Sequence, residues 1–266
     1  MITQPSLFGL ADSAAATKTA LVSAAAWWGL FSLPLFLVVA DDKRAGAVSP
    51  RRAAREGLRQ FAQTFREIRA LRPVLIFLLA FWLYNDGVGT VMRVASAFTL
   101  DLGMDSADIM KALLLTQFVG FPAALVFGAL GTQFGPKTGI YLCIAVYALA
   151  IVYATQLNEP SDLYILAGTI GLVQGGIQSL SRSLYARLIR RDKSGEFYGF
   201  YNMLGKFAAV AGPALMTAAA FLLPEERDNL QILVLLLLFG GGALLLAAVK
   251  VPAVSEIDRG GPRQAV

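Results

Sequence analysis

Long apolar runs separated by short polar segments dominate the pattern of this 266-residue chain. A helix that crosses a bilayer needs about 20 predominantly apolar residues, and seven runs reach about that length. We predict seven spanning helices, at residues 18–40, 73–98, 109–130, 138–156, 163–184, 197–223 and 230–251. The ten-residue alternation that is typical of a membrane β-barrel is not found in the sequence. The pattern therefore predicts an all-α integral membrane protein.

The polar segments between the predicted spans differ in charge. Residues 41–72 hold nine basic side chains, whereas the segments 99–108, 157–162 and 224–229 are mainly acidic. Basic loops of membrane proteins lie on the cytoplasmic side. We therefore expect the basic loop and the C-terminus in the cytoplasm, the N-terminus outside and, in a bacterium, a location in the inner membrane.

These features divide the chain into four predicted parts. Residues 1–40 form an outer N-terminal segment and the first transmembrane helix, and residues 41–72 form a basic cytoplasmic loop. Residues 73–252 form a six-helix bundle, and residues 253–266 form a cytoplasmic tail.

The basic loop itself has a helical pattern, because apolar residues recur in it at three- and four-residue spacing with arginines between them. The residues that set this spacing are Leu58, Phe61, Phe65, Ile68 and Leu71. Such an amphipathic helix lies in the inner leaflet interface, or it forms a specific site for a lipid headgroup or a partner. The sequence does not separate these two interpretations.

Composition limits the chemistry. Hydrophobic residues make up 56% and charged residues 15% of the chain, and the mean hydropathy is +0.61, whereas soluble domains carry roughly 25% charge. The chain has no histidine, and its single cysteine, Cys143, lies in an apolar run. These absences argue against histidine-dependent catalytic sites and against cysteine metal sites. We expect no enzyme activity, no cofactor, no metal and no nucleic-acid partner. The expected partners are the lipid bilayer and a small-molecule solute.

Asp86 is the most unusual residue within a predicted span. An ionisable side chain in a membrane helix costs about 2.5–3.5 kcal/mol on insertion scales. Asp86 lies about 20 Å along its helix at 1.5 Å per residue, next to Asn85 and before Gly87 and Gly89. Asp86 has a substrate, coupling-ion or gating role, or its carboxylate forms a hydrogen bond to a neighbouring helix.

Lys206 is a second ionisable residue within a predicted span. It follows Tyr201 and Asn202 on the sixth span, and these three residues include an i, i+4 pair that would share one helix face. Lys206 either extends its side chain to the cytoplasmic surface or contacts an anion, and Asp86 is a candidate partner. We expect Arg93, nearer the outer end of its helix, to reach the membrane surface or to pair with a loop carboxylate.

Several amides also lie at membrane depth. Gln174 and Gln178 are one helical turn apart, among glycines whose spacing allows close helix packing. We interpret these two glutamines as lining a cavity. Gln117 is an isolated amide, for which we expect one interhelical hydrogen bond.

Three segments resemble a known family. YNDGVGT (84–90), GLVQGGIQSLSRSL (171–184) and GEFYGFYNMLGKFAAVAGP (195–213) are similar to the vacuole-effluxer-like, autophagy-related branch of the major facilitator superfamily. The resemblance implies secondary active transport of small solutes, amino acids among them, by alternating access between two six-helix halves. The resemblance also implies that seven motif positions lie along the pathway of the solute or ion: Asn85, Asp86, Gln174, Gln178, Tyr201, Asn202 and Lys206.

The resemblance also bears on the extent of the chain. A complete member of the family has twelve spans, and this chain is similar to the sixth helix, the central loop and the C-terminal half. We therefore expect a partial chain that requires an N-terminal transporter half. A membrane scaffold without transport activity, or an inactive remnant half, is the alternative.

The segment GALGTQFGPK (128–137) resembles the gating loop G-x-x-x-D-R-x-G-x-K/R of the superfamily. Gly128, Gly135 and Lys137 match this motif, whereas Thr132 and Gln133 replace its acidic residue and its arginine. In the superfamily, this acidic residue and this arginine usually form an ion pair at a helix terminus. This chain has neither residue, but the backbone turn does not depend on them.

Overall fold

A computed structural model of the chain describes residues 9, 11–38, 49–101, 106–156, 159–207, 209–222 and 231–251. All regular secondary structure in these residues is helical. Six apolar helical stretches among them are long enough to cross a membrane, and one of these, Ser194–Phe221, contains two shorter helices. The predicted all-α membrane class is therefore confirmed. The predicted C-terminal tail and most of the non-helical part of the basic loop, 41–48, lie outside the described residues. The chain divides into two units, Met1–Gly57 and Leu58–Val266.

The first unit contains α1 (Ser13–Val38). This helix begins five residues before the predicted first span, and residues 39–40 of that span lie outside the described residues. Large apolar side chains are exposed around its circumference, among them Trp27 and Trp28. A helix that is apolar on every side is suited to lipid or to a buried position.

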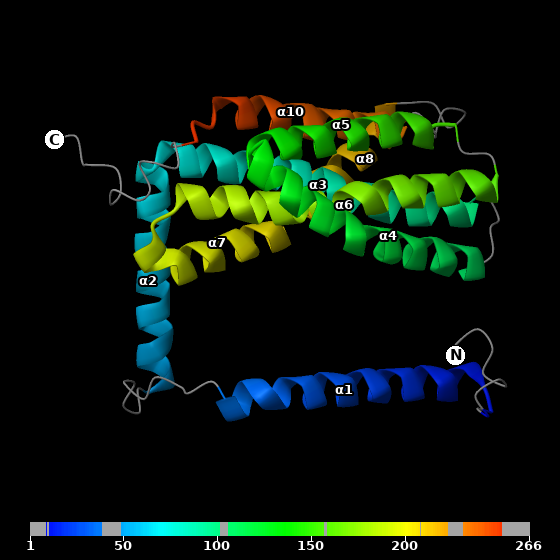
Figure 1. Ribbon diagram of the computed structural model, residues 1–266, viewed down its shortest axis with the longest axis horizontal. Helices are drawn as coiled ribbons and strands as arrows, with labels where there is room; N and C mark the ends of the chain where they lie inside the picture. The colour runs from blue at the N-terminus through cyan, green and yellow to red at the C-terminus, as the bar shows by residue number, and fades with distance from the viewer. Residues whose placement is uncertain are drawn as a thin grey trace. The chain divides into compact units, whose positions relative to one another are not determined.

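The second unit is a helical bundle. Among the described residues from Arg72 onward, its α-helices are α3 (Arg72–Asp101), α4 (Ser106–Gln133), α5 (Pro136–Ala154), α6 (Pro160–Leu188), α7 (Ser194–Phe207), α8 (Ala211–Leu222) and α10 (Leu236–Ala248). Two short 3-10 helices, η2 (Arg191–Lys193) and η4 (Ile232–Leu235), precede α7 and α10. Successive spans run in opposite directions, and α6 packs against both α4 and α5 while α3 packs against α10 (Figure 1).

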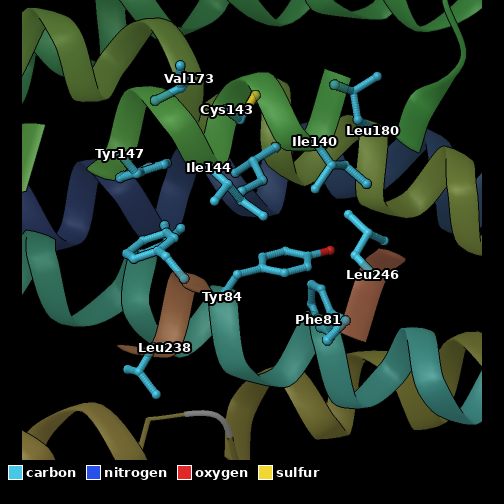
Figure 2. Close-up of a cluster of buried hydrophobic side chains, with 14 of the residues drawn as sticks. Phe81, Tyr84, Ile140, Cys143, Ile144, Tyr147, Val173, Leu180, Leu238 and Leu246 are labelled. Atoms are coloured by element: carbon cyan, nitrogen blue, oxygen red, sulfur yellow. The ribbon is translucent and has the colours of Figure 1, made fainter. Parts of the chain in front are cut away.

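Aromatic and aliphatic side chains form the core where α3, α5, α6 and α10 meet (Figure 2). Tyr147 of α5 stacks on Phe239 of α10 with 5.3 Å between ring centroids. A Cβ atom at Gly242 of α10 would come within 3.2 Å of the Ala80 carbonyl oxygen, so glycine permits the close approach of α10 to α3. Cys143 is a buried, free cysteine in this core, as a small packed residue would be.

The basic loop contains the predicted amphipathic helix, α2 (Pro50–Ala70). From Leu58 onward this helix belongs to the second unit, and its apolar side faces the first turns of α7. The rings of Phe61 and Phe65 lie with their centroids 5.7 and 6.0 Å from that of Phe200, and Ile68 is fully buried. Protein therefore covers part of the apolar face that the sequence had suggested for the lipid interface.

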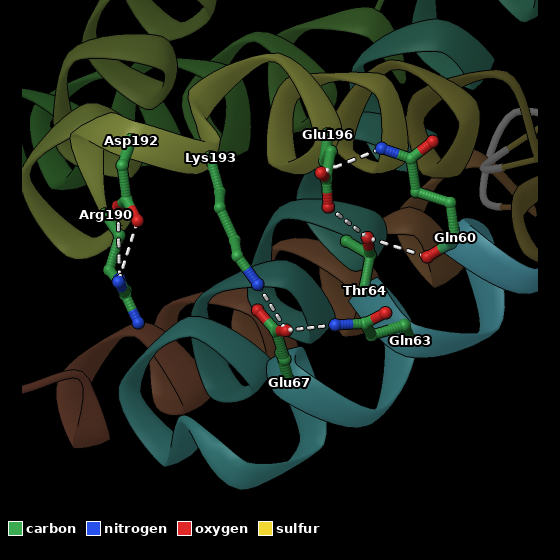
Figure 3. A network of polar contacts seen from close by, with 8 residues as sticks. All are labelled: Gln60, Gln63, Thr64, Glu67, Arg190, Asp192, Lys193 and Glu196. Carbon is green, nitrogen blue, oxygen red and sulfur yellow. Dashed lines mark hydrogen bonds and ion pairs between the residues drawn. The ribbon is translucent and has the colours of Figure 1, made fainter.

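Polar contacts hold the same part of α2 against η2 and the first turn of α7 (Figure 3). Gln60 donates a hydrogen bond to Glu196 at 2.8 Å, and the Thr64 hydroxyl donates to the other oxygen of Glu196 at 2.9 Å. One turn further along α2, Glu67 forms an ion pair with Lys193 at 2.5 Å. These contacts connect the basic loop to the bundle at one end of the spans.

The sixth predicted span, residues 197–223, is not a single helix. It is divided into α7, which ends at Phe207, and α8, which begins at Ala211. At 1.5 Å per residue, the two helices are about 21 and 18 Å long, and each is too short to cross a hydrocarbon core of about 30 Å. The two helices are therefore consecutive pieces of one interrupted span.

Candidate functional site

The predicted pathway residues occupy several different environments. Asp86 lies inside the bundle, on the side of α3 that faces the start of α8, and its side chain is 0% exposed. Its Oδ2 atom accepts a hydrogen bond from the backbone N–H of Gly212 at 2.6 Å. Its Oδ1 atom lies 3.4 Å from the Thr90 hydroxyl and 3.8 Å from Nη2 of Arg93. This carboxylate is thus partnered by the protein itself.

Asp86 forms an ion pair with Arg93. Lys206 forms no ion pair with any of the described residues. The pair between Asp86 and Lys206 that the sequence left open is therefore not formed. Arg93 also donates a hydrogen bond to the Thr90 hydroxyl at 2.9 Å, and half of its side chain is exposed. Lys206 itself is exposed in the last turn of α7.

A different arrangement surrounds the two glutamines of α6. Gln174 and Gln178 line a hollow of about 340 Å³ between α4 and α6, together with Gln117 of α4. Gln117 and Gln178 are exposed, and Gln174 is half-buried. None of the three side chains forms a hydrogen bond with another described residue. The interhelical hydrogen bond expected for Gln117 is therefore not formed.

Two glycines are among the residues that line this hollow. Gly120 and Gly175 are lining residues, as are Thr116 and Phe121. A Cβ atom at Gly175 would lie 2.9 Å from the Gly120 carbonyl oxygen, so the glycines set how closely α4 and α6 approach. The close approach leaves a polar depression with no charged side chain in its lining.

The depth of the hollow matters for what it can do. Gln174 is 14 residues from the first residue of α6 and Gln117 is 11 residues from the first residue of α4, or about 21 and 17 Å along helices of about 42 Å. Lipid chains offer no partner to a carboxamide at this depth. The three amides are therefore available to water, to a solute or to another protein surface.

The remaining predicted pathway residues do not join this hollow. Tyr201 is buried in an aromatic cluster, stacked on Phe81 with 4.2 Å between centroids and on Tyr185 with 5.0 Å. Asn202 is exposed on α7, and Asn85 is half-buried on α3. The described residues thus divide the predicted pathway among α3, α6 and α7.

The predicted gating loop forms a tight turn between α4 and α5. Gly135 has a φ of 83°, a conformation that residues with a side chain rarely adopt. Lys137 donates hydrogen bonds to the carbonyl oxygens of Ala247 and Val249 at 3.0 and 2.8 Å, where the last carbonyls of α10 need partners. Gly128 has open space around it. Lys137 therefore connects the loop to the end of α10.

Gln117 is the residue of the hollow that sequence reasoning did not place on the pathway. A single amide on a helix gives no local pattern, and only the packing of α4 on α6 brings it beside the other two glutamines. The sequence did contain one indication that Gln117 lies level with Gln174. The two residues lie at similar distances from the starts of their helices, which are on the same side of the membrane.

Comparison with known proteins extends over most of the chain. The family described as "Vacuole effluxer Atg22 like" matches residues 3–253. An MFS-type transporter of Bacillus subtilis (strain 168), named YxiO and uncharacterized, is 37% identical over 208 residues, which cover 78% of this chain and 48% of that protein. Autophagy-related protein 22 of Coccidioides immitis (strain RS) is 27% identical over 72% of this chain and 36% of that protein.

A further relative has the same coverage pattern. Autophagy-related protein 22 of Yarrowia lipolytica (strain CLIB 122 / E 150) is 24% identical over 75% of this chain and 39% of its own length. The chain thus spans about half or less of the length of these relatives. Its multiple apolar helices and its match from residue 3 to residue 253 lead to one conclusion: this chain is a multi-pass integral membrane protein that belongs to the vacuole effluxer Atg22-like family of the major facilitator superfamily.

Proposed function

We propose that this chain is part of a secondary active transporter that moves small polar solutes, amino acids among them, by alternating access. Family membership supports the class of activity. The observation that carries the proposal is the hollow between α4 and α6, where Gln117, Gln174 and Gln178 present free carboxamides at membrane depth. Carboxamides both donate and accept hydrogen bonds, and so they match the mixed polar groups of such solutes.

We further propose that an N-terminal half completes the solute cavity. The relatives are two to three times longer than the stretch that matches this chain, and transporters of this kind bind solute between two halves. The hollow is open on the side away from the packed core, because Gln117, Phe121 and Gln178 are exposed there. In this arrangement a second half covers the open side and turns the hollow into a closed cavity.

The proposed orientation places the N-terminus outside and the C-terminus in the cytoplasm. The arginine-rich helix α2 and the η2 segment then lie on the cytoplasmic side, as the distribution of basic residues favours. The ion pair of Glu67 with Lys193 supports such a position, since it joins α2 to η2 at one end of the bundle.

A transport assay on a restored two-half protein tests this function. The chain is joined to the N-terminal half encoded upstream or in an adjacent frame, reconstituted in vesicles, and loaded with a labelled mixture of amino acids. We expect release of label by the parent protein. We also expect about tenfold slower release by the double variant Gln174→Leu/Gln178→Leu, since each lost hydrogen bond to a solute is worth about 0.5–1.5 kcal/mol.

Gln133→Leu is the matched control, because Gln133 ends α4 outside the hollow and undergoes the same chemical change. Its release rate is expected to equal that of the parent. Absence of release from the restored parent protein for any polar solute would contradict transport and favour a membrane scaffold. Normal release by the double variant would remove the hollow from the pathway.

A further inference from the structure

The interruption between α7 and α8 creates a specific problem inside a membrane. The first backbone N–H groups of a helix have no partner within that helix, and the hydrocarbon core supplies none. α8 begins at Ala211, within one apolar stretch that extends from Ser194 to Phe221. The start of α8 therefore requires acceptors from elsewhere in the protein.

The sequence and the fold meet this requirement in two ways. Pro213 is the third residue of α8 and has no N–H group to satisfy. The N–H of Gly212 is bound by Oδ2 of Asp86, a residue 126 positions away in the sequence. A carboxylate at a helix N-terminus is also favoured by the helix dipole. Asp86 thus acts as a cap that comes from another span.

A second contact fixes the same point. A Cβ atom at Gly212 would overlap the Thr90 hydroxyl oxygen and lie 2.8 Å from Thr90 Cβ. The backbone of α8 therefore contacts α3 directly, one turn from Asp86. Thr90 in turn accepts a hydrogen bond from Arg93. The start of α8 is therefore held on α3 by shape as well as by the carboxylate.

From this geometry we infer that Asp86 is a positioning residue, which fixes the start of α8 on α3 by accepting the Gly212 N–H. It acts through this hydrogen bond and not through contact with a solute or a coupling ion. The negative charge is secondary in this role. A neutral acceptor of the same shape should perform it.

If Asp86 acts as a hydrogen-bond acceptor for Gly212, two substitutions with the same number of side-chain heavy atoms should have different effects. Asp86→Asn keeps a side-chain oxygen that can accept the Gly212 N–H, whereas Asp86→Leu keeps the approximate volume and removes every acceptor. The direct readout is hydrogen–deuterium exchange of the backbone amide of Gly212, measured by mass spectrometry on the 266-residue chain in lipid nanodiscs. This readout does not depend on transport, so it remains valid if the proposed function fails.

We expect slow exchange at Gly212 in the parent chain and in Asp86→Asn, and exchange at least tenfold faster in Asp86→Leu. In the restored two-half protein, Asp86→Asn should keep at least half of the parent transport rate, and Asp86→Leu should lose most of it. Gln133→Leu, at the last residue of α4, is the control for any general effect of an added leucine.

Three results would overturn the inference. Unchanged exchange in Asp86→Leu would show that the carboxylate does not hold α8. Faster exchange in Asp86→Asn would show that the charge is essential. Loss of transport in Asp86→Asn with parent-like exchange would assign Asp86 a direct role toward an ion or solute. The last two results rest on Asp86→Asn alone, so the test stands even if Asp86→Leu does not fold.

Discussion

Asp86 and the hollow lined by the three glutamines are two polar regions at similar depth in long apolar helices. They differ in whether other parts of the protein bind their polar groups. The carboxylate of Asp86 is fully buried and has partners on α3 and α8. The carboxamides of Gln117, Gln174 and Gln178 are uncovered and form no hydrogen bond with the described residues. Both regions need glycine, at Gly212 and at Gly175, for the close helix contact beneath them.

The difference shows how a polar residue in a membrane helix can be interpreted. A polar group that the protein satisfies is part of the scaffold, because removing one partner leaves the other unsatisfied in an apolar medium. A polar group that the protein leaves open retains its hydrogen-bonding capacity for a mobile partner. Charge alone would rank Asp86 above the glutamines as a solute contact, but the carboxylate is enclosed by protein partners and the glutamines are not.

The largest expected effect is at the start of α8. Gly212→Leu would place side-chain atoms within the volume of Thr90, and overpacking of this kind costs about 1–3 kcal/mol or more. We expect the thermal midpoint of the chain in detergent to fall by roughly 5–10 °C. The measurement is thermal unfolding followed by tryptophan fluorescence.

Gly199→Leu is the control for this change, since a Cβ atom at Gly199 of α7 meets nothing within 4 Å. Its midpoint should stay near that of the parent. If Gly212→Leu and Gly199→Leu behave alike, the start of α8 is not held on α3 as described.

A smaller loss of stability is expected where α4 and α6 meet beside the hollow. Gly175→Ala places a Cβ atom 2.9 Å from the Gly120 carbonyl oxygen and from Ala124 Cβ, and we expect a cost of about 1–2 kcal/mol. Gly168→Ala, two turns earlier on α6, meets nothing within 4 Å and should gain up to about 1 kcal/mol from helix propensity. Thermal unfolding of the two variants measures the difference, and equal midpoints would count against the close contact of α4 with α6.

Gln117→Leu should separate stability from transport. The amide has no partner among the described residues, so its loss should change the free energy of unfolding by less than about 0.5 kcal/mol. Transport by the restored protein should fall about two- to tenfold, as expected for one hydrogen bond to a solute. A marked drop in the thermal midpoint would mean that Gln117 has a structural role, as we propose for Asp86.

The smallest effect is expected for a carboxylate outside the spans. Arg190 donates hydrogen bonds to Asp192 at 2.7 and 3.1 Å, and both side chains are more than half exposed. These bonds lower the pKa of the Asp192 carboxyl below its ordinary value. Its stabilising contribution is therefore present above the unfolded-state pKa of about 3.9 and is lost as the pH falls through the lower folded-state pKa.

Because water screens an exposed pair, Asp192→Asn should leave the thermal midpoint at pH 7 within the error of the measurement. Any difference between variant and parent should diminish as the pH falls below the unfolded-state pKa of about 3.9. A large shift at pH 7 would show that exposure is a poor guide to the importance of carboxylates in this protein.

Residue patterns predicted some parts of the fold because those parts depend on local properties. The predicted starts of the second and fourth to sixth spans lie within about three residues of α3, α5, α6 and α7, since apolar length is sufficient to define a span. The interruption at Phe207 was not predicted, although Gly212 and Pro213 are adjacent signals for a new helix start. A helix break in a membrane is stable only with an acceptor nearby, and sequence alone does not locate that acceptor.

The candidate site was predictable only in part. Gln174 and Gln178 share a face because they are four residues apart on one helix. Gln117 and Asp86 depend on partners from other helices, α6 for the first and α8 for the second. Spacing along one helix says nothing about which neighbour lies opposite.

The sequence by itself determined that this protein is an all-α membrane protein with a strongly basic loop and polar residues at membrane depth. Hydropathy and charge act locally, and each segment carries its own preference for lipid or water. Only the tertiary structure decided that Asp86 is enclosed by Gly212 while the glutamines remain open. Hydrogen bonds between helices depend on packing, and packing joins residues that lie more than a hundred positions apart.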